Sequence, residues 1–118
     1  MIRRSSDDAE PFTTADGSTI RVLLDREIAR AQNQSLAEAE LRPGEATQRH
    51  YHAASEEIYF VLTGTGEMEV DDSRQQVRPG DAVLIPPGSW HQIRARDGPL
   101  RFLCLCAPPY RDEDTFFA

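Results

Sequence analysis

Turn residues divide this chain into short segments, and no other feature of the sequence limits its fold as strongly. The segments between the turns have the alternating or β-branched composition of strands. The turns recur roughly every 8 to 12 residues, a spacing typical of all-β sandwiches and small barrels. They fall at Pro43-Gly44, Thr63 to Gly66, Pro79 to Asp81, Pro86 to Gly88 and Asp97 to Pro99. The sequence therefore predicts an antiparallel all-β fold.

The expected strands cover residues 18–24, 35–41, 57–62, 67–70, 75–77, 82–85, 90–96 and 100–106. The second of these is ambiguous, because the residues between Arg26 and Leu41 include many that also favour a helix. Ala37 and Ala39 alternate with glutamates there, and all that follows is β, so we favour a strand.

A chain of 118 residues has room for one domain. We expect a flexible arm over residues 1–17, because this segment is polar and ends in a turn. The barrel itself should span about residues 18–107. The acidic tail over residues 108–118 is expected to wrap the surface.

The expected strand over residues 57–62 is apolar on both faces. Tyr59 and Val61 share one parity, and Ile58, Phe60 and Leu62 share the other. A strand with one face in water would alternate with polar residues, so this strand should be covered on both sides. The barrel interior would cover one face, and a second layer or subunit the other. We therefore expect a homodimer.

Charge and residue types exclude several classes of function. Thirteen basic and twenty acidic residues give a net charge of −7, which argues against nucleic acid or an anionic membrane as a partner. Every basic residue is arginine, and the absence of lysine excludes Schiff-base and P-loop lysines. Two cysteines are too few for a disulfide framework. With no secretory signal and no apolar run of ~20 residues, we expect a cytoplasmic protein.

The three histidines of the chain occur at positions that favour a shared metal site. His50 and His52 lie two residues apart, so on a strand their side chains project from the same face. Glu57 has the wrong parity for that strand and can join the histidines only if residues 53–55 turn the chain. His91 opens another strand, on its inward parity.

Three neutral imidazoles and one carboxylate suit a divalent first-row transition metal such as Fe, Mn, Ni, Cu or Zn, rather than Ca or Mg. In a six-coordinate ion they would leave two positions open for water, oxygen or substrate. We expect this metal and no other cofactor. The predicted ligands are His50, His52, Glu57 and His91.

The spacing of these residues resembles both sequence motifs of the cupin superfamily. The first motif comprises Gly44, His50, His52, Glu57 and Gly64, separated by five, one, four and six residues. The second comprises Gly80, Pro86, Gly88 and His91, separated by five, one and two residues. The resemblance covers roughly residues 36 to 107 and implies a small, single-domain antiparallel jelly-roll (cupin) barrel with the metal in its lumen.

Two details of the resemblance leave alternatives open. The family tolerates three or four residues before the glutamate, so Glu56 is an alternative ligand, although the gap to Gly64 favours Glu57. The second motif usually ends with an Asn four residues after the histidine, and this chain has Ala95 there. That departure affects the surroundings of the site rather than its ligands.

Strand parity extends the expected pocket beyond the metal ligands. Gln48 shares the parity of His50, and Tyr59 that of Glu57, so both should face inward, to contact substrate or simply to pack. Phe102 and Cys104 share one face of their strand and are expected to line the barrel. For Cys104 we favour inert packing over a chemical role.

The resemblance leaves three hypotheses for function, since cupin barrels carry many activities. The first is a small metal-dependent enzyme with oxygenase-type chemistry, such as a dioxygenase, on a small organic molecule. The second is a sugar isomerase, epimerase or lyase. Arg49, Arg94 and Arg96 have outward parity, which disfavours a phosphosugar as the substrate. The third is a non-catalytic module that binds a small molecule through the metal.

Overall fold

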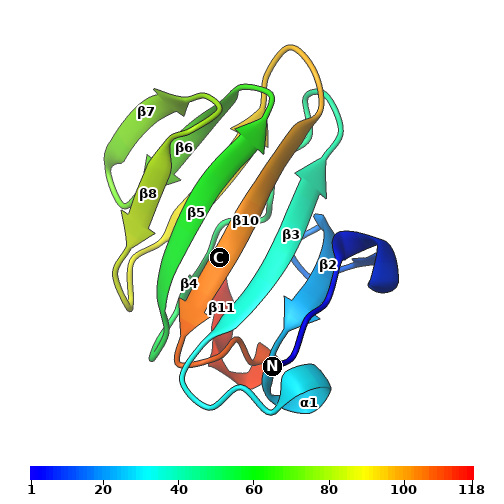
Figure 1. The fold of residues 1–118 in the computed structure, drawn as a ribbon. Coiled ribbons are helices and arrows are strands. Elements are labelled where there is room, and N and C mark those ends of the chain that lie inside the picture. The colour runs from blue at the N-terminus through cyan, green and yellow to red at the C-terminus, as the bar shows by residue number, and fades with distance from the viewer.

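The computed structural model describes residues 1–118 and consists of two antiparallel sheets that form a jelly-roll barrel (Figure 1). The six-stranded sheet runs β1 (Phe12–Thr13), β2 (Thr19–Leu24), β3 (Ser35–Leu41), β10 (Leu100–Ala107), β5 (Glu56–Thr63), β8 (Ala82–Ile85). The five-stranded sheet runs β11 (Thr115–Phe117), β4 (His50–His52), β9 (His91–Ala95), β6 (Gly66–Val70), β7 (Ser73–Val77). The predicted fold class is therefore confirmed.

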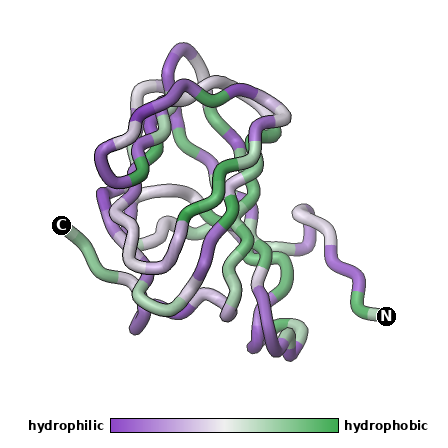
Figure 2. Tube along the Cα trace, turned by 90° about the vertical axis from the view of Figure 1, so that its left-hand side faces the viewer, coloured by the Kyte–Doolittle hydropathy of each residue, from purple (hydrophilic) through white to green (hydrophobic).

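The strands follow the local patterns from which they were predicted. The ambiguous segment forms β3 over Ser35–Leu41, and its alanines pack inside the barrel. The helical composition before it produces only a single turn, α1 (Arg26–Ala29), whose first turn is capped by the side chain of Asp25. Figure 2 shows hydrophobic residues along the strands that cross the middle of the molecule and hydrophilic residues in many of the connecting loops.

Both ends of the chain contribute strands that lie outside the predicted limits of the barrel. In the segment expected to be an arm, a 3-10 turn (Ser6–Asp8) precedes β1, which pairs with β2. In the tail, a second 3-10 turn (Asp112–Asp114) leads into β11, which pairs with β4. The tail is thus the edge of the five-stranded sheet rather than a surface wrap. Segments of two or three residues give too little periodicity to be recognised in a sequence.

The interior is filled at one end and hollow at the other. Leu100 and Phe102 of β10 belong to the hydrophobic core, together with residues such as Leu41 of β3. Farther along the same face of β10, Cys104 and Cys106 line a cavity that Phe102 also borders. The hollow end is the one that contains the histidines.

The two faces of β5 are both apolar, as the sequence shows, but they differ in burial. Tyr59 and Val61 are buried inside the barrel, whereas Ile58 and Phe60 on the outer face are 38% and 37% exposed. The expectation that the barrel covers one apolar face is therefore confirmed.

No helix of this structure has both the length and the apolar character needed to cross a membrane.

Candidate metal centre

Three short segments bring the four predicted ligands together. β4 and β9 pair so that His50 lies directly opposite His91, and His52 follows two residues later on the same face of β4. Glu57 projects from β5 in the other sheet, so the cluster spans the space between the two sheets. All four residues are buried, and His91 is fully so.

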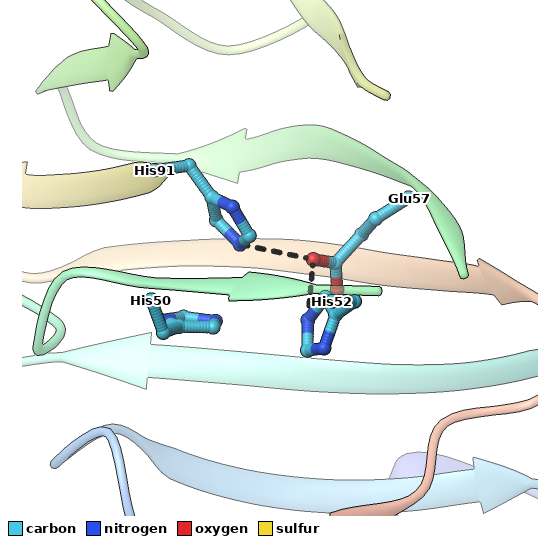
Figure 3. Close-up of side chains that lie close together, drawn as sticks. All are labelled: His50, His52, Glu57 and His91. Carbon is cyan, nitrogen blue, oxygen red and sulfur yellow. Dashed lines mark ion pairs between the residues drawn. The ribbon is translucent and has the colours of Figure 1, made fainter. Parts of the chain in front are cut away.

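The side chains of these residues point toward one another, as Figure 3 shows. Glu57 Oε1 lies 3.2 Å from His52 Nε2 and 3.3 Å from His91 Nε2. The ring centroids of His50 and His91 are 4.2 Å apart. One potential ligand atom from each of the four residues lies within 4.8 Å of the others. The cluster is therefore compact enough for all four to bind one ion.

Hydrogen bonds donated by the three Nδ1 atoms orient the imidazole rings. His50 Nδ1 donates to the carbonyl oxygen of Gln48 at 2.7 Å, and His91 Nδ1 donates to that of Ser89 at 3.0 Å. His52 Nδ1 lies 3.1 Å from the Thr115 hydroxyl, which itself donates to a carbonyl and so accepts from the imidazole. With Nδ1 protonated in each neutral ring, every Nε2 presents a lone pair to the cluster, as metal ligation requires.

Electrostatics keep the carboxylate ionised. Burial alone would raise the pKa of Glu57, but the contacts with His52 and His91 outweigh burial and lower that pKa to about 2. Burial and the nearby His91 lower the pKa of His50, which favours its neutral form. Burial also acts to lower the pKa of His52, but the contact with Glu57 outweighs it and raises that pKa.

Two buried polar atoms in the cluster lack hydrogen bonds, which tests whether a metal fits there. Glu57 Oε1 and His91 Nε2 have no hydrogen-bond partner, although they lie close to each other. The other oxygen, Glu57 Oε2, accepts a hydrogen bond from Cys106 Sγ at 3.2 Å. Buried polar atoms are rarely left without a partner, and a cation among these donors would satisfy both. The residues present therefore fit a metal ion.

The cluster opens into a cavity of about 830 Å³. Tyr59, Phe102 and Cys104 line this cavity with His50, His52 and Glu57, as their strand parity predicts. Gln48 does not, and its predicted inward orientation is wrong: its side chain is exposed. β4 begins only at His50, so strand parity does not extend back to Gln48, and Thr47 is buried instead. Gln48 contributes its carbonyl oxygen rather than its side chain.

The charges around the cavity are mostly negative. Arg49, Arg94 and Arg96 do not line it, in agreement with their predicted outward parity. Three other arginines line the cavity. One of them, Arg4, donates hydrogen bonds to the carbonyl oxygens of Val22 and Leu23. Seven carboxylates outnumber those arginines in the lining. Six of the seven are separate from the four predicted ligands: Glu10, Asp16, Asp25, Glu27, Asp112 and Glu113.

Reasoning from the sequence missed the residues that the two ends of the chain bring to the site. Thr115 orients His52, and the neighbouring Asp114 binds the backbone of the turn between β4 and β5. Asp16 was read only as part of a turn, but it lines the cavity. Thr115, Phe116 and Phe117 are residue types that favour strands, and they are the one signal in the tail that could have indicated β11.

Comparison with known proteins agrees with this geometry. The chain is 43% identical over 116 residues to an uncharacterised protein of Methanocaldococcus jannaschii, covering 98% of this chain and 93% of that protein. It is 40% identical over 52 residues to the 5-aminosalicylate 1,2-dioxygenase of Comamonas sp., covering 44% of this chain and 14% of the dioxygenase.

Among solved structures, the polyketide cyclase RemF from Streptomyces resistomycificus superposes with a TM-score of 0.80 at 27% identity, covering 97% of this chain and 89% of RemF. The Cupin domain family matches residues 37–106, which include both motifs and all four residues of the cluster. The chain belongs to the cupin domain family.

Proposed function

We propose that this protein is a metal-dependent enzyme that carries out oxygenase-type chemistry on a small organic molecule bound in the barrel. The observation that carries the proposal is the convergence of three Nε2 atoms and one carboxylate oxygen, two of them lacking hydrogen bonds, beside a cavity of about 830 Å³. The similarity to a dioxygenase of Comamonas, although limited to 52 residues, supports the same chemistry.

His50, His52, Glu57 and His91 would hold the ion. A bound first-row metal would supply open coordination positions for oxygen and substrate, and redox chemistry if it is iron, manganese or copper. The residues around it prepare the site for that role. The Nδ1 hydrogen bonds keep the imidazoles in the ligating tautomer, and Cys106 leaves only one oxygen of Glu57 free.

Tyr59 and Phe102 form the apolar wall next to the cluster, with ring centroids 4.8 Å apart. Their bulk excludes water from that side of the cavity. Burial raises the pKa of Tyr59 well above its ordinary value, so its phenol stays protonated. It can therefore donate a hydrogen bond but cannot act as a base.

Metal analysis and oxygen uptake test the proposal together. Protein purified without added metal should contain close to one transition-metal ion per chain, and H52A should lose it because two nitrogen ligands cannot hold the ion as three do. Q48A is the matched control: its side chain is exposed, and it should keep the metal. An H52A variant with full metal occupancy would overturn the site. Iron-loaded protein should consume oxygen with catechol as the probe.

The similarity to RemF favours one second candidate. RemF is a polyketide cyclase. Its similarity covers 97% of this chain, whereas the similarity to the dioxygenase covers 44%. In that case the metal would polarise a carbonyl oxygen, and the reaction would rearrange its substrate without oxidation. A product with the same elemental composition as the substrate, formed at the same rate under nitrogen, would select this candidate over the oxygenase.

We further propose that the protein acts as a homodimer formed through the outer face of β5, β8 and β10. The strand register places Ile58 between Leu84 and Leu105, and Phe60 beside Leu103. Ile58, Phe60 and Leu84 are 38%, 37% and 56% exposed. On a chain with a net charge of −7, an apolar patch of this kind suits a second copy of itself, because the same patch on two copies is self-complementary about a two-fold axis.

Light scattering tests the dimer. The wild-type protein should have twice the mass of one chain, and F60E should have the mass of a monomer because it would place a charge in the apolar interface. F116E is the control, since Phe116 is 42% exposed on the other sheet. A monomeric wild-type protein, or a dimer disrupted equally by both substitutions, would contradict this assignment.

A further inference from the structure

Asp16 lies in the wall of the cavity and outside the residues that the Cupin domain family matches. One of its carboxylate oxygens, Oδ1, accepts hydrogen bonds from Thr14 Oγ1 at 2.5 Å, Ser18 Oγ at 2.6 Å and the Ser18 backbone N–H at 2.9 Å. Thr14 and Ser18 are themselves joined by a backbone hydrogen bond of 2.9 Å. The side chain is therefore fixed in one orientation by the turn that carries it.

The other carboxylate oxygen, Asp16 Oδ2, makes no hydrogen bond or ion pair within the chain. All three hydrogen bonds to this carboxylate go to Oδ1. The side chain is half-buried, so Oδ2 is not sealed in the core. A carboxylate that is held through one oxygen while the other remains free is prepared to accept a hydrogen bond from a ligand.

The backbone of Gln48 connects Asp16 to His50 of the candidate metal site. The Asp16 carbonyl oxygen accepts a hydrogen bond from the Gln48 N–H at 2.7 Å, and the Gln48 carbonyl oxygen accepts one from His50 Nδ1, also at 2.7 Å. Two hydrogen bonds to the backbone of Gln48 therefore join Asp16 to His50, and both residues line the same cavity. A molecule bound at the cluster would occupy the cavity that Asp16 also lines.

The rest of the lining defines the kind of molecule that fits. Between Asp16 and the core, the wall consists of apolar side chains from β2 and β3: Ile20, Val22, Ala37 and Ala39. The two alanines leave room for a flat ring system, and the volume lies within the usual range of small-molecule sites. The excess of carboxylates over arginines in the cavity lining disfavours an anionic ligand.

We infer that Asp16 determines substrate specificity, by accepting a hydrogen bond from a hydroxyl or amino group of a largely apolar, neutral or cationic substrate. This inference rests on the proposed function only in taking the cavity as the substrate site. It assigns to the N-terminal segment a role in recognition, and it predicts that anionic analogues of the same size bind poorly.

Three naphthalene probes and the zinc-loaded protein, which is redox-inert, test the inference by calorimetry. The probes are 2-naphthol, which carries a donor, 2-methoxynaphthalene, which has none, and the anion 2-naphthoate. The wild-type protein should bind 2-naphthol about tenfold more tightly than 2-methoxynaphthalene, the effect of one hydrogen bond to a charged acceptor. 2-Naphthoate can also bind zinc through its carboxylate, so its affinity is compared only between the wild-type protein and its variants.

D16N is the informative variant. Thr14 and Ser18 require an acceptor, so the asparagine should keep its oxygen in the Oδ1 position and turn its NH2 group toward the ligand. The preference for 2-naphthol should then disappear, and 2-naphthoate should gain affinity. E27Q is the matched control, because it removes the same charge from an exposed residue of the same cavity, and it should keep the 2-naphthol preference.

D16A gives a second measurement should D16N alter folding, and melting temperatures identify any such change. D16A should also lose the preference for 2-naphthol. Equal preference in the wild-type, D16N and D16A proteins would overturn the inference, as would equal loss in E27Q. Failure of the oxygenase proposal would show instead as an absence of oxygen uptake, with the probe selectivity of the wild-type protein unchanged.

Discussion

The carboxylate of Asp114 binds the backbone N–H of Ala54, a residue that precedes it by 60 positions, through hydrogen bonds of 2.9 and 3.1 Å. A third hydrogen bond of 3.1 Å comes from the N–H of Ser55. These two residues lie in the turn that must reverse the chain for Glu57 to face the histidines. The C-terminal tail therefore stabilises the turn on which the geometry of the candidate metal site depends.

Replacement of Asp114 should weaken both the fold and the metal site. D114A leaves the N–H groups of Ala54 and Ser55 without an acceptor, which should lower the free energy of unfolding by about 1–3 kcal/mol. D114N keeps an acceptor and should lose less. Urea unfolding and zinc titration measure the two effects. D112A, at a more exposed residue of the same turn, should change neither, and equal losses in both variants would contradict this role.

The same carboxylate makes stability depend on acid pH. Burial acts to raise the pKa of Asp114, but the hydrogen bonds from Ala54 and Ser55 outweigh burial and hold that pKa below its ordinary value. A pKa that folding lowers adds stability that is present above about pH 4 and is lost as the pH falls through the folded pKa. The free energy of unfolding should therefore fall more steeply below pH ~4 in the wild type than in D114N. Parallel acid profiles would contradict this prediction.

Cys106 should control how Glu57 presents its oxygens. Burial and the charge of Glu57 raise the pKa of the Cys106 thiol, which stays protonated and donates to Glu57 Oε2. C106S keeps a donor and should retain metal affinity, whereas the apolar C106V should lower it by roughly 10-fold or more. Competition with a zinc chelator measures this ratio. If C106S and C106V bind zinc equally, the hydrogen bond has no influence on the ligand.

Two glycines of the first motif should respond differently to alanine. Gly44 and Gly64 both have positive φ, +78° and +85°, so either substitution introduces backbone strain of about 1–2 kcal/mol. At Gly64 an added Cβ would also overlap the carbonyl oxygen of Pro99, whereas nothing lies within 4 Å at Gly44. G64A should therefore lose a further ~1–3 kcal/mol of unfolding free energy relative to G44A. Equal losses would show that the strand ends shift freely.

Part of the candidate site could be predicted from the sequence, and part could not. The convergence of the four predicted ligands followed from spacing and strand parity, because His50 and His52 share a strand and the turn to Glu57 is short. Gln48 shows where parity fails: it lies only two residues before His50, yet outside β4, and its side chain is exposed. Parity is informative only as far as the strand itself extends.

The sequence by itself determined the β class, most strand positions and the identity of the cluster, because period-two alternation, turn residues and motif spacing are local properties. Only the tertiary structure decided that Asp16, Asp114 and Thr115 belong to the site. Thr115 reaches His52 because β11 pairs with β4, a contact across 63 residues. Such contacts depend on how the two ends of the chain pack against the barrel, and no local pattern encodes that packing.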